Sequence, residues 1–147
     1  EYLEEHLILM PSDAGGFKRL LKLCNIIIWE GETFSASKSR KWDGTKSTLV
    51  QEIGKTDFKG KDILIIDDIC VRGGTFVGLA KILKSKNVGK IYLAVSHMTI
   101  EYPNAEIFSL FDTVFTTNSK FENYFIPQKE GGVKPENLII EKLFKYI

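Results

Sequence analysis

Residues 62–76, "DILIIDDICVRGGTF", carry the strongest structural pattern in the chain. Four aliphatic residues, 63–66, lead directly into two adjacent carboxylates, Asp67 and Asp68, and then into a turn that contains two glycines. A short aliphatic run that ends in small residues and gives way to a helical pattern is typical of a buried strand followed by a helix. The stretch therefore predicts a strand, a loop and a helix in succession.

The same order of apolar run, polar turn and helical pattern recurs along the chain, as in folds built from parallel strands and crossing helices. We therefore expect an α/β fold, with a mostly parallel twisted sheet flanked by helices. The expected strands are residues 7–10, 26–29, 48–53, 63–66, 90–96, 113–116 and 138–140. The helical patterns are residues 14–24, 75–86 and 104–110, with a helical turn at 143–147.

Length and composition predict one soluble domain over residues 1–147. The hydrophobic fraction of 44% is ordinary, and 20 basic residues balance 19 acidic ones. Nucleic-acid and anionic-membrane binding usually need a strongly basic surface, so neither is expected. The apolar runs are far shorter than the roughly 20 residues that cross a bilayer. The acidic beginning "EYLEEHLILM" also differs from the positive start of a secretory signal, which favours a cytoplasmic protein.

The two cysteines are expected to be free thiols. Cys24 and Cys70 stand at no metal-ligand spacing, and Cys24 lies within a helical apolar pattern. Buried and reduced cysteines are the usual state in a reducing compartment.

Residues 30–47, "EGETFSASKSRKWDGTKS", form a long polar and basic segment without apolar periodicity. The pattern predicts a mobile loop or an irregular hairpin, and loops of this length inside compact domains are often functional. Its basic residues Lys38, Arg40, Lys41 and Lys46 are equally consistent with a solvated surface. Residues 118–134 are expected to form a second polar loop.

The acid pair and the turn after it suit different parts of one ligand. Ligands of open parallel sheets bind beyond the carboxyl ends of the strands, where helix N-termini direct free N–H groups. The glycine turn before Thr75 can therefore hold a phosphate, and Thr75 can either cap the helix or donate its hydroxyl to that phosphate. Two carboxylates accept hydrogen bonds from neighbouring hydroxyls or bind Mg²⁺. A sugar phosphate matches both parts, although Asp and Gly are also common as plain turn residues.

The segment "ILIIDDICVRGGT" resembles the binding signature of the type I phosphoribosyltransferase fold. In that family the paired acids contact the 2′ and 3′ hydroxyls of a ribose, and the loop holds the 5′-phosphate. The resemblance implies that Asp67 and Asp68 bind the ribose and that residues 71–75 bind the phosphate. The implied ribose 5-phosphate site consists of Asp67, Asp68, Cys70, Val71, Arg72, Gly73, Gly74 and Thr75.

Features outside that segment resemble the ribose-phosphate pyrophosphokinases of the fold. "PSDAGG" is similar to a segment whose aspartate contributes to a metal site, which implies that Asp13 binds Mg²⁺. "SKSR" is similar to the family's catalytic loop, which implies that Lys38 and Arg40 stabilise the transferring phosphates. "AVSHMT" and "FDTVFTTNS" follow in the family's order. The resemblance is to the C-terminal half of such enzymes, without the N-terminal half, and it implies ATP, ribose 5-phosphate and phosphoribosyl pyrophosphate as ligands and a homo-oligomer.

The chain departs from the family pattern in its phosphate loop. Val71 stands where most members carry a third acid, and Arg72 stands where they carry a small polar residue. Because transferases use that acid near the reacting carbon, Val71 weakens the alternative of a phosphoribosyltransferase acting on a nucleobase. A non-catalytic regulator that binds phosphoribosyl compounds remains a second alternative. Neither His6 nor His97 matches the family's metal-binding histidine, and both are expected to be structural or surface residues.

Overall fold

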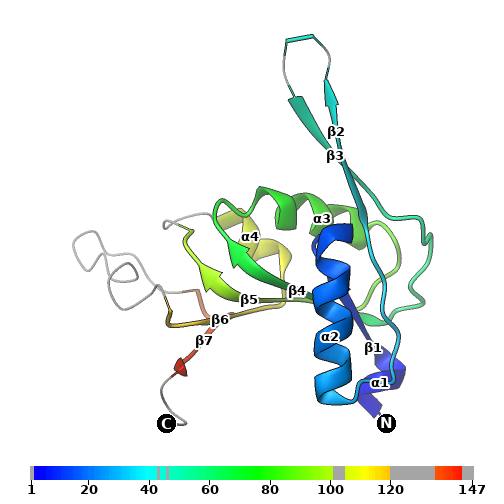
Figure 1. The fold of residues 1–147 in the computed structure, drawn as a ribbon, viewed down its shortest axis with the longest axis vertical. Helices are drawn as coiled ribbons and strands as arrows, with labels where there is room; N and C mark the ends of the chain where they lie inside the picture. The colour runs from blue at the N-terminus through cyan, green and yellow to red at the C-terminus, as the bar shows by residue number, and fades with distance from the viewer. Residues whose placement is uncertain (1, 43, 46, 101–104, 120–134, 144–147) are drawn as a thin grey trace.

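The computed structural model describes residues 2–42, 44–45, 47–100, 105–119 and 135–143. Five strands form one sheet in the order β1-β4-β5-β6-β7, and every neighbouring pair in it is parallel. These strands are β1 (Leu7–Pro11), β4 (Asp62–Cys70), β5 (Ile91–Met98), β6 (Thr113–Thr117) and β7 (Leu138–Glu141). The predicted α/β class is confirmed, and Figure 1 shows the sheet with helices around it.

The hydrophobic core has two parts, one on each face of the sheet, and helices pack on both. The helices are α1 (Tyr2–His6), the short 3-10 helix η1 (Ala14–Gly16), α2 (Phe17–Ile27), α3 (Gly74–Lys84) and α4 (Ala105–Leu110). Successive strand residues point to opposite faces. Leu9 of β1 accordingly packs with Leu20 and Cys24 of α2, whereas Ile8 and Met10 belong to the larger core. That larger core includes residues of α3 and α4, namely Phe76, Leu79, Leu83 and Ile107.

Strand β4 runs past the end of its neighbour β1. The pairing with β1 ends at Pro11, opposite Ile66, while the pairing with β5 continues to Cys70, opposite Met98. The expected strand of residues 63–66 therefore extends to Cys70 and includes both acids. Asp67 and Asp68 lie where β4 has lost one neighbour and kept the other, which opens the edge of the sheet to a ligand.

Strands β2 (Ser37–Trp42) and β3 (Ser47–Glu52) pair antiparallel as a hairpin, which extends away from the sheet in Figure 1. The sequence predicted either a mobile loop or an irregular hairpin for residues 30–47. The hairpin is confirmed from Ser37 onward. The residues that flank the hairpin, Ala36 and Ile53, are buried in the core beside Phe58. The ribbon is thus anchored at its base by apolar packing.

The strand expected at residues 26–29 is wrong. Helix α2 continues through Ile27, and Ile28 ends it in the left-handed conformation with φ 53° and ψ 50°. The Trp29 backbone N–H then donates to the Cys24 carbonyl at 2.8 Å, which closes the last turn. Three consecutive isoleucines favour a strand by propensity, but the helix extends over the first two of them, and all three stay exposed instead of entering the sheet.

The other expected elements lie where the sequence indicates them, with ends shifted by one or two residues. Cys24 and Cys70 are both buried and free, as predicted. Most of the polar loop expected at 118–134, and most of the helical turn expected at 143–147, fall outside the described residues. Among the described residues, no helix is both long and apolar enough to span a bilayer.

Candidate functional site

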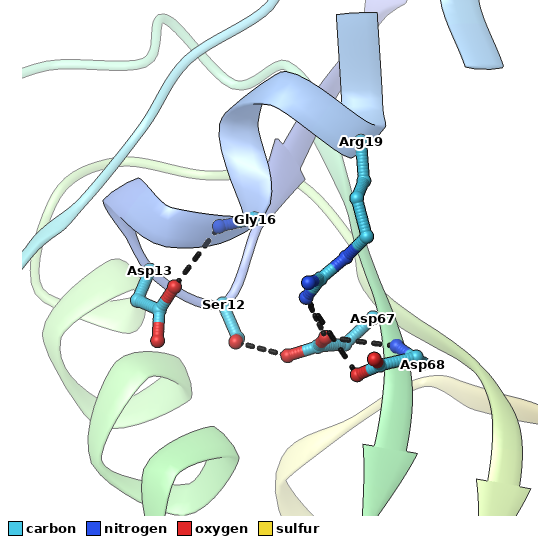
Figure 2. A network of polar contacts seen from close by, with 6 residues as sticks. All are labelled: Ser12, Asp13, Gly16, Arg19, Asp67 and Asp68. Carbon is cyan, nitrogen blue, oxygen red and sulfur yellow. Dashed lines mark hydrogen bonds and ion pairs between the residues drawn. The ribbon is translucent and has the colours of Figure 1, made fainter. Parts of the chain in front are cut away.

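The acid pair lies beside the turn that follows β1, and three groups donate to Asp67 (Figure 2). The Ser12 hydroxyl donates to Oδ2 of Asp67. Oδ1 accepts from the Asp68 backbone N–H at 2.8 Å and from the Arg19 guanidinium at 3.2 Å. Since Ser12 follows Pro11, the register partner of Ile66, parallel pairing itself brings Ser12 level with Asp67.

Arg19 reaches the acids from the first turns of α2, as Figure 2 shows. Its Nη2 lies 3.2 Å from Asp67 Oδ1 and 3.6 Å from Asp68 Oδ1. The Arg19 side chain is 60% exposed. An ion pair with so exposed a partner contributes only about 0–1 kcal/mol. Arg19 therefore partly neutralises the acids and adds little to the stability of the fold.

The two acids differ in their pKa. Burial raises the pKa of Asp67, although the hydrogen bond from Ser12 acts in the opposite direction. The hydrogen bond that Asp68 shares with Asp67 lowers the pKa of Asp68, and the nearby Arg19 charge lowers it further. Asp67 is therefore the first of the two to take up a proton as the pH falls.

Asp13 lies on the other side of the same turn, and in Figure 2 its carboxylate is directed to the Gly16 backbone N–H. Its Oδ1 accepts from the Gly16 backbone N–H at 3.1 Å and caps η1. Within the described residues, no group of three or more His, Cys, Asp or Glu side chains could hold a metal ion. Asp13 is thus placed as a single carboxylate near the acids, and its role toward a metal stays a prediction.

The loop of residues 71–75 leads from β4 into α3. Gly73 has φ 74° and ψ −12° and is the N-cap of α3, a left-handed conformation that glycine adopts without steric cost. Thr75 is the second residue of the helix, so the alternative in which it caps the helix is wrong. The first backbone N–H groups of an α-helix have no partner within the helix, so this turn offers donors to an anion. Val71, in the same loop, is 53% exposed.

Cys70 ends β4 just before the loop. Its side chain is fully buried in the core, and burial raises the pKa of the Cys70 thiol to about 12. The thiol is therefore neutral and faces away from solvent. Any contribution of Cys70 to a ligand site must come from its backbone.

Asp67 lines two cavities. One, of about 190 Å³, is lined by Asp67 and Asp68 together with Gly16, Arg19 and Ser96. The other, of about 230 Å³, is lined by Asp67 with Ser96, Thr116, Thr117 and Glu141. Since a water molecule takes up about 30 Å³, either volume accommodates a ligand of pentose size.

Lys38 and Arg40 are not part of this cluster. Both lie on β2, where Lys38 pairs with Gln51 and Arg40 with Leu49. In Figure 1 the hairpin that carries them rises from the side of the sheet where α3 lies. The structure thus places Asp13, Asp67 and Asp68 around the end of β1, and it places the two basic residues on a separate element.

Three residues near the site were not singled out from the sequence, namely Ser12, Arg19 and Gln51. Ser12 and Arg19 contact Asp67, which lies 55 and 48 positions further along the chain. Gln51 donates from Nε2 to the Thr75 carbonyl at 3.1 Å. Only the strand order and register bring these residues together, and neither can be read from a local pattern.

Comparisons with known proteins identify the family of the chain. The family model of the phosphoribosyl transferase domain matches residues 2–129. The ribose-phosphate pyrophosphokinase of Chlorobaculum tepidum is 28% identical over 143 residues, which cover 96% of this chain and 43% of that protein. The corresponding protein of Nostoc sp. is 34% identical over 136 residues, which cover 91% of this chain and 38% of that protein.

Solved structures agree on the fold. The phosphoribosylpyrophosphate synthetase of Mycobacterium smegmatis aligns with a TM-score of 0.67 at 19% identity, over 97% of this chain and 42% of that chain. The purine phosphoribosyltransferase of Pyrococcus horikoshii aligns with a TM-score of 0.54 at 14% identity, over 99% of this chain and 81% of that chain. The chain spans less than half the length of the pyrophosphokinases it matches. It belongs to the phosphoribosyl transferase domain family and is related to the ribose-phosphate pyrophosphokinases within that family.

Proposed function

We propose that this chain carries the ribose 5-phosphate site of a ribose-phosphate pyrophosphokinase. In that reaction the 1-hydroxyl oxygen of ribose 5-phosphate attacks the β-phosphorus of ATP and loses its proton. The bond from the β-phosphorus to the bridging oxygen of the α-phosphate breaks, so that phosphoribosyl pyrophosphate forms and AMP leaves. Because the chain spans less than half the length of its relatives, the whole reaction is assigned to the full natural protein, acting as a homo-oligomer.

The observation that carries the proposal is the acid pair beside a helix N-terminus. Ionised carboxylates accept hydrogen bonds only, so Asp67 and Asp68 suit the two ring hydroxyls of a ribose. The donors to Asp67 from Ser12 and Arg19 hold its carboxylate in one orientation. The acids would therefore orient the sugar, with no part in bond making.

The glycine turn would hold the phosphate. Backbone N–H groups at the start of α3 and the partial positive charge of the helix N-terminus favour a phosphate dianion. Gly73 permits the left-handed conformation from which the helix begins. With Val71 in place of an acid, the loop adds no negative charge beside that phosphate.

Lys38 and Arg40 would supply charge to the reaction itself. Phosphoryl transfer develops negative charge on the transferring oxygens, and fixed positive charges lower its barrier. The nucleophile belongs to the sugar, so the hairpin residues need only stabilise charge. An element that closes over bound substrates can bring such charges in while it excludes water.

Mg²⁺ fits this scheme through Asp13. The ion usually binds through one or two carboxylates together with substrate phosphates, so a single aspartate beside the acid pair suits it. When bound with ATP, Mg²⁺ would neutralise charge on the diphosphate that is transferred. The acid pair is less suited to the metal, because Arg19 already compensates its charge.

The test is AMP formation from ATP and ribose 5-phosphate with Mg²⁺, measured on the full natural protein and on this chain. We expect the full protein to form AMP only when both substrates are present. Binding of ribose 5-phosphate without AMP formation would overturn the proposed reaction and favour a regulator. Release of pyrophosphate from phosphoribosyl pyrophosphate on addition of a nucleobase would favour a phosphoribosyltransferase.

A further inference from the structure

We propose that Gln51 is a positioning residue that holds the β2–β3 hairpin against the first turn of α3. The catalytic part of this inference rests on the proposed function, since it assigns Lys38 and Arg40 to that hairpin. The anchoring part is a property of the fold. The two parts can be tested separately in one set of variants.

The contact joins the hairpin directly to the end of the phosphate loop. Gln51 lies on β3, and its Nε2 donates to the backbone carbonyl of Thr75 at 3.1 Å. Thr75 is the second residue of α3 and the last residue of the loop. A single side chain thus ties the ribbon to the backbone that is expected to hold the phosphate.

Gly78, one turn further along α3, makes room for this side chain. A Cβ atom on Gly78 would lie 2.4 Å from Oε1 and 3.6 Å from Cδ of Gln51. Glycine inside a helix is unfavourable by about 1 kcal/mol relative to alanine. A glycine at this position is therefore explained by the close approach of the Gln51 amide.

Further along α3, toward its C-terminal end, a groove separates the helix from the base of the hairpin. This open groove of about 680 Å³ is lined by Glu52 and Ile53 near the end of β3 and by Ile82 and Lys86 near the end of α3. Gln51 therefore bridges the two elements at the edge of a groove rather than within a packed interface.

The register relates this bridge to the proposed catalytic residues. In the antiparallel register, Gln51 of β3 lies opposite Lys38 of β2. Two residues further along each strand, Leu49 lies opposite Arg40. Directly opposite positions of an antiparallel pair belong to the same face. The positions of Lys38 and Arg40 thus share the face of the ribbon from which Gln51 meets α3.

Two variants break the contact in different ways. Gln51→Met removes the donor and keeps the length of the side chain. Gly78→Ala leaves Gln51 in place, displaces its amide, and improves the helix propensity of α3. Gly54→Ala is the matched control, because a Cβ atom there would have no heavy atom within 4 Å.

The first measurement is hydrogen exchange of the amides of residues 37–52 in the full natural protein without substrates. We expect exchange on the order of fivefold faster in both Gln51→Met and Gly78→Ala, as the loss of one hydrogen bond implies, and unchanged in Gly54→Ala. Equal exchange in the wild type and both variants would overturn the anchor, whether or not the protein binds ribose 5-phosphate.

The second measurement is AMP formation by the same proteins. Both variants should lower kcat several-fold with little change in KM for ribose 5-phosphate, since the acid pair and loop are intact. Gly78→Ala separates positioning from stability, because this variant should melt no earlier than the wild type and still lose kcat. An unchanged kcat with accelerated exchange would overturn the catalytic part, and a wild type that makes no AMP would refute the proposed function alone.

Discussion

The acid pair and the hairpin are held in place by different means. Asp67 and Asp68 belong to a strand with a parallel neighbour, and donors from the turn after β1 and from α2 fix the Asp67 carboxylate. The hairpin is a two-stranded ribbon, a structure that is marginally stable alone. It depends on apolar residues at its base, Ala36 and Ile53, and on the Gln51 hydrogen bond to α3.

This difference suggests a division of labour between the two regions. A site fixed by the sheet can hold a sugar in one orientation, whereas an element with few anchors can adjust when substrates arrive. Binding and chemistry should then respond separately to mutation. Changes in the sheet site should remove binding, and changes in the hairpin should lower kcat alone.

The largest effect is expected from Asp67→Asn combined with Asp68→Asn. A hydrogen bond to a charged group contributes about 1.5–3 kcal/mol, so loss of both carboxylates should weaken ribose 5-phosphate binding on the order of 1,000-fold. Isothermal titration calorimetry of the natural protein measures the affinity. Glu106→Gln makes the same chemical change at the exposed ion pair with Lys81 and should leave the affinity unchanged. Undiminished binding by the double variant would remove the ribose role of the pair.

Lys38→Ala should have the next largest effect, on kcat alone. Removal of one group that stabilises transition-state charge typically costs on the order of 100-fold in rate. The affinity for ribose 5-phosphate should stay near the wild-type value, because the sheet site is intact. Steady-state assays of AMP formation give kcat and KM, with Lys59→Ala as an exposed control. A parallel loss of sugar affinity would contradict the separation of the two regions.

The contrast between the acid pair and the hairpin also explains which features the sequence could predict. The acid pair, the glycine turn and the start of α3 follow one another within residues 62–76, so their chemistry is visible as a local pattern. Register is not local. The donors Ser12 and Arg19 become visible only when β1 is known to pair with β4 and to end opposite Ile66.

Helix α2 and the hairpin show where local patterns mislead. The β-branched residues at 26–28 favour a strand, but the helix that begins at Phe17 continues through Ile27 and leaves these isoleucines exposed. The hairpin has no regular apolar alternation, because its two strands leave the core and have no sheet to face. Its contact with α3 through Gln51 is likewise tertiary, and no spacing within residues 30–53 indicates it.

A smaller effect is expected from pH. Sugar hydroxyls donate to the ionised form of Asp67, so affinity should fall as the pH drops through its pKa, by at most about tenfold per pH unit. Because burial raises that pKa, the decline should begin at a higher pH than for an ordinary aspartate. Asp67→Asn should lose this early decline and Asp68→Asn should keep it. Since the sugar phosphate also titrates, with a second pKa of about 6, the difference between the two variants is the quantity to measure by calorimetry.

The smallest effect is expected from Arg19→Gln, which removes the positive charge beside the acid pair. Since 60% of the Arg19 side chain is exposed, the free energy of unfolding should change by less than about 1 kcal/mol. The pKa of Asp68 should rise, because the nearby guanidinium charge helps to lower it. Carbon-detected NMR titration of the aspartate carboxyl groups measures that shift, and chemical denaturation measures the stability. A large loss of stability with no change in the pKa of Asp68 would show that the Arg19 side chain acts through packing and does not set the charge of the acid pair.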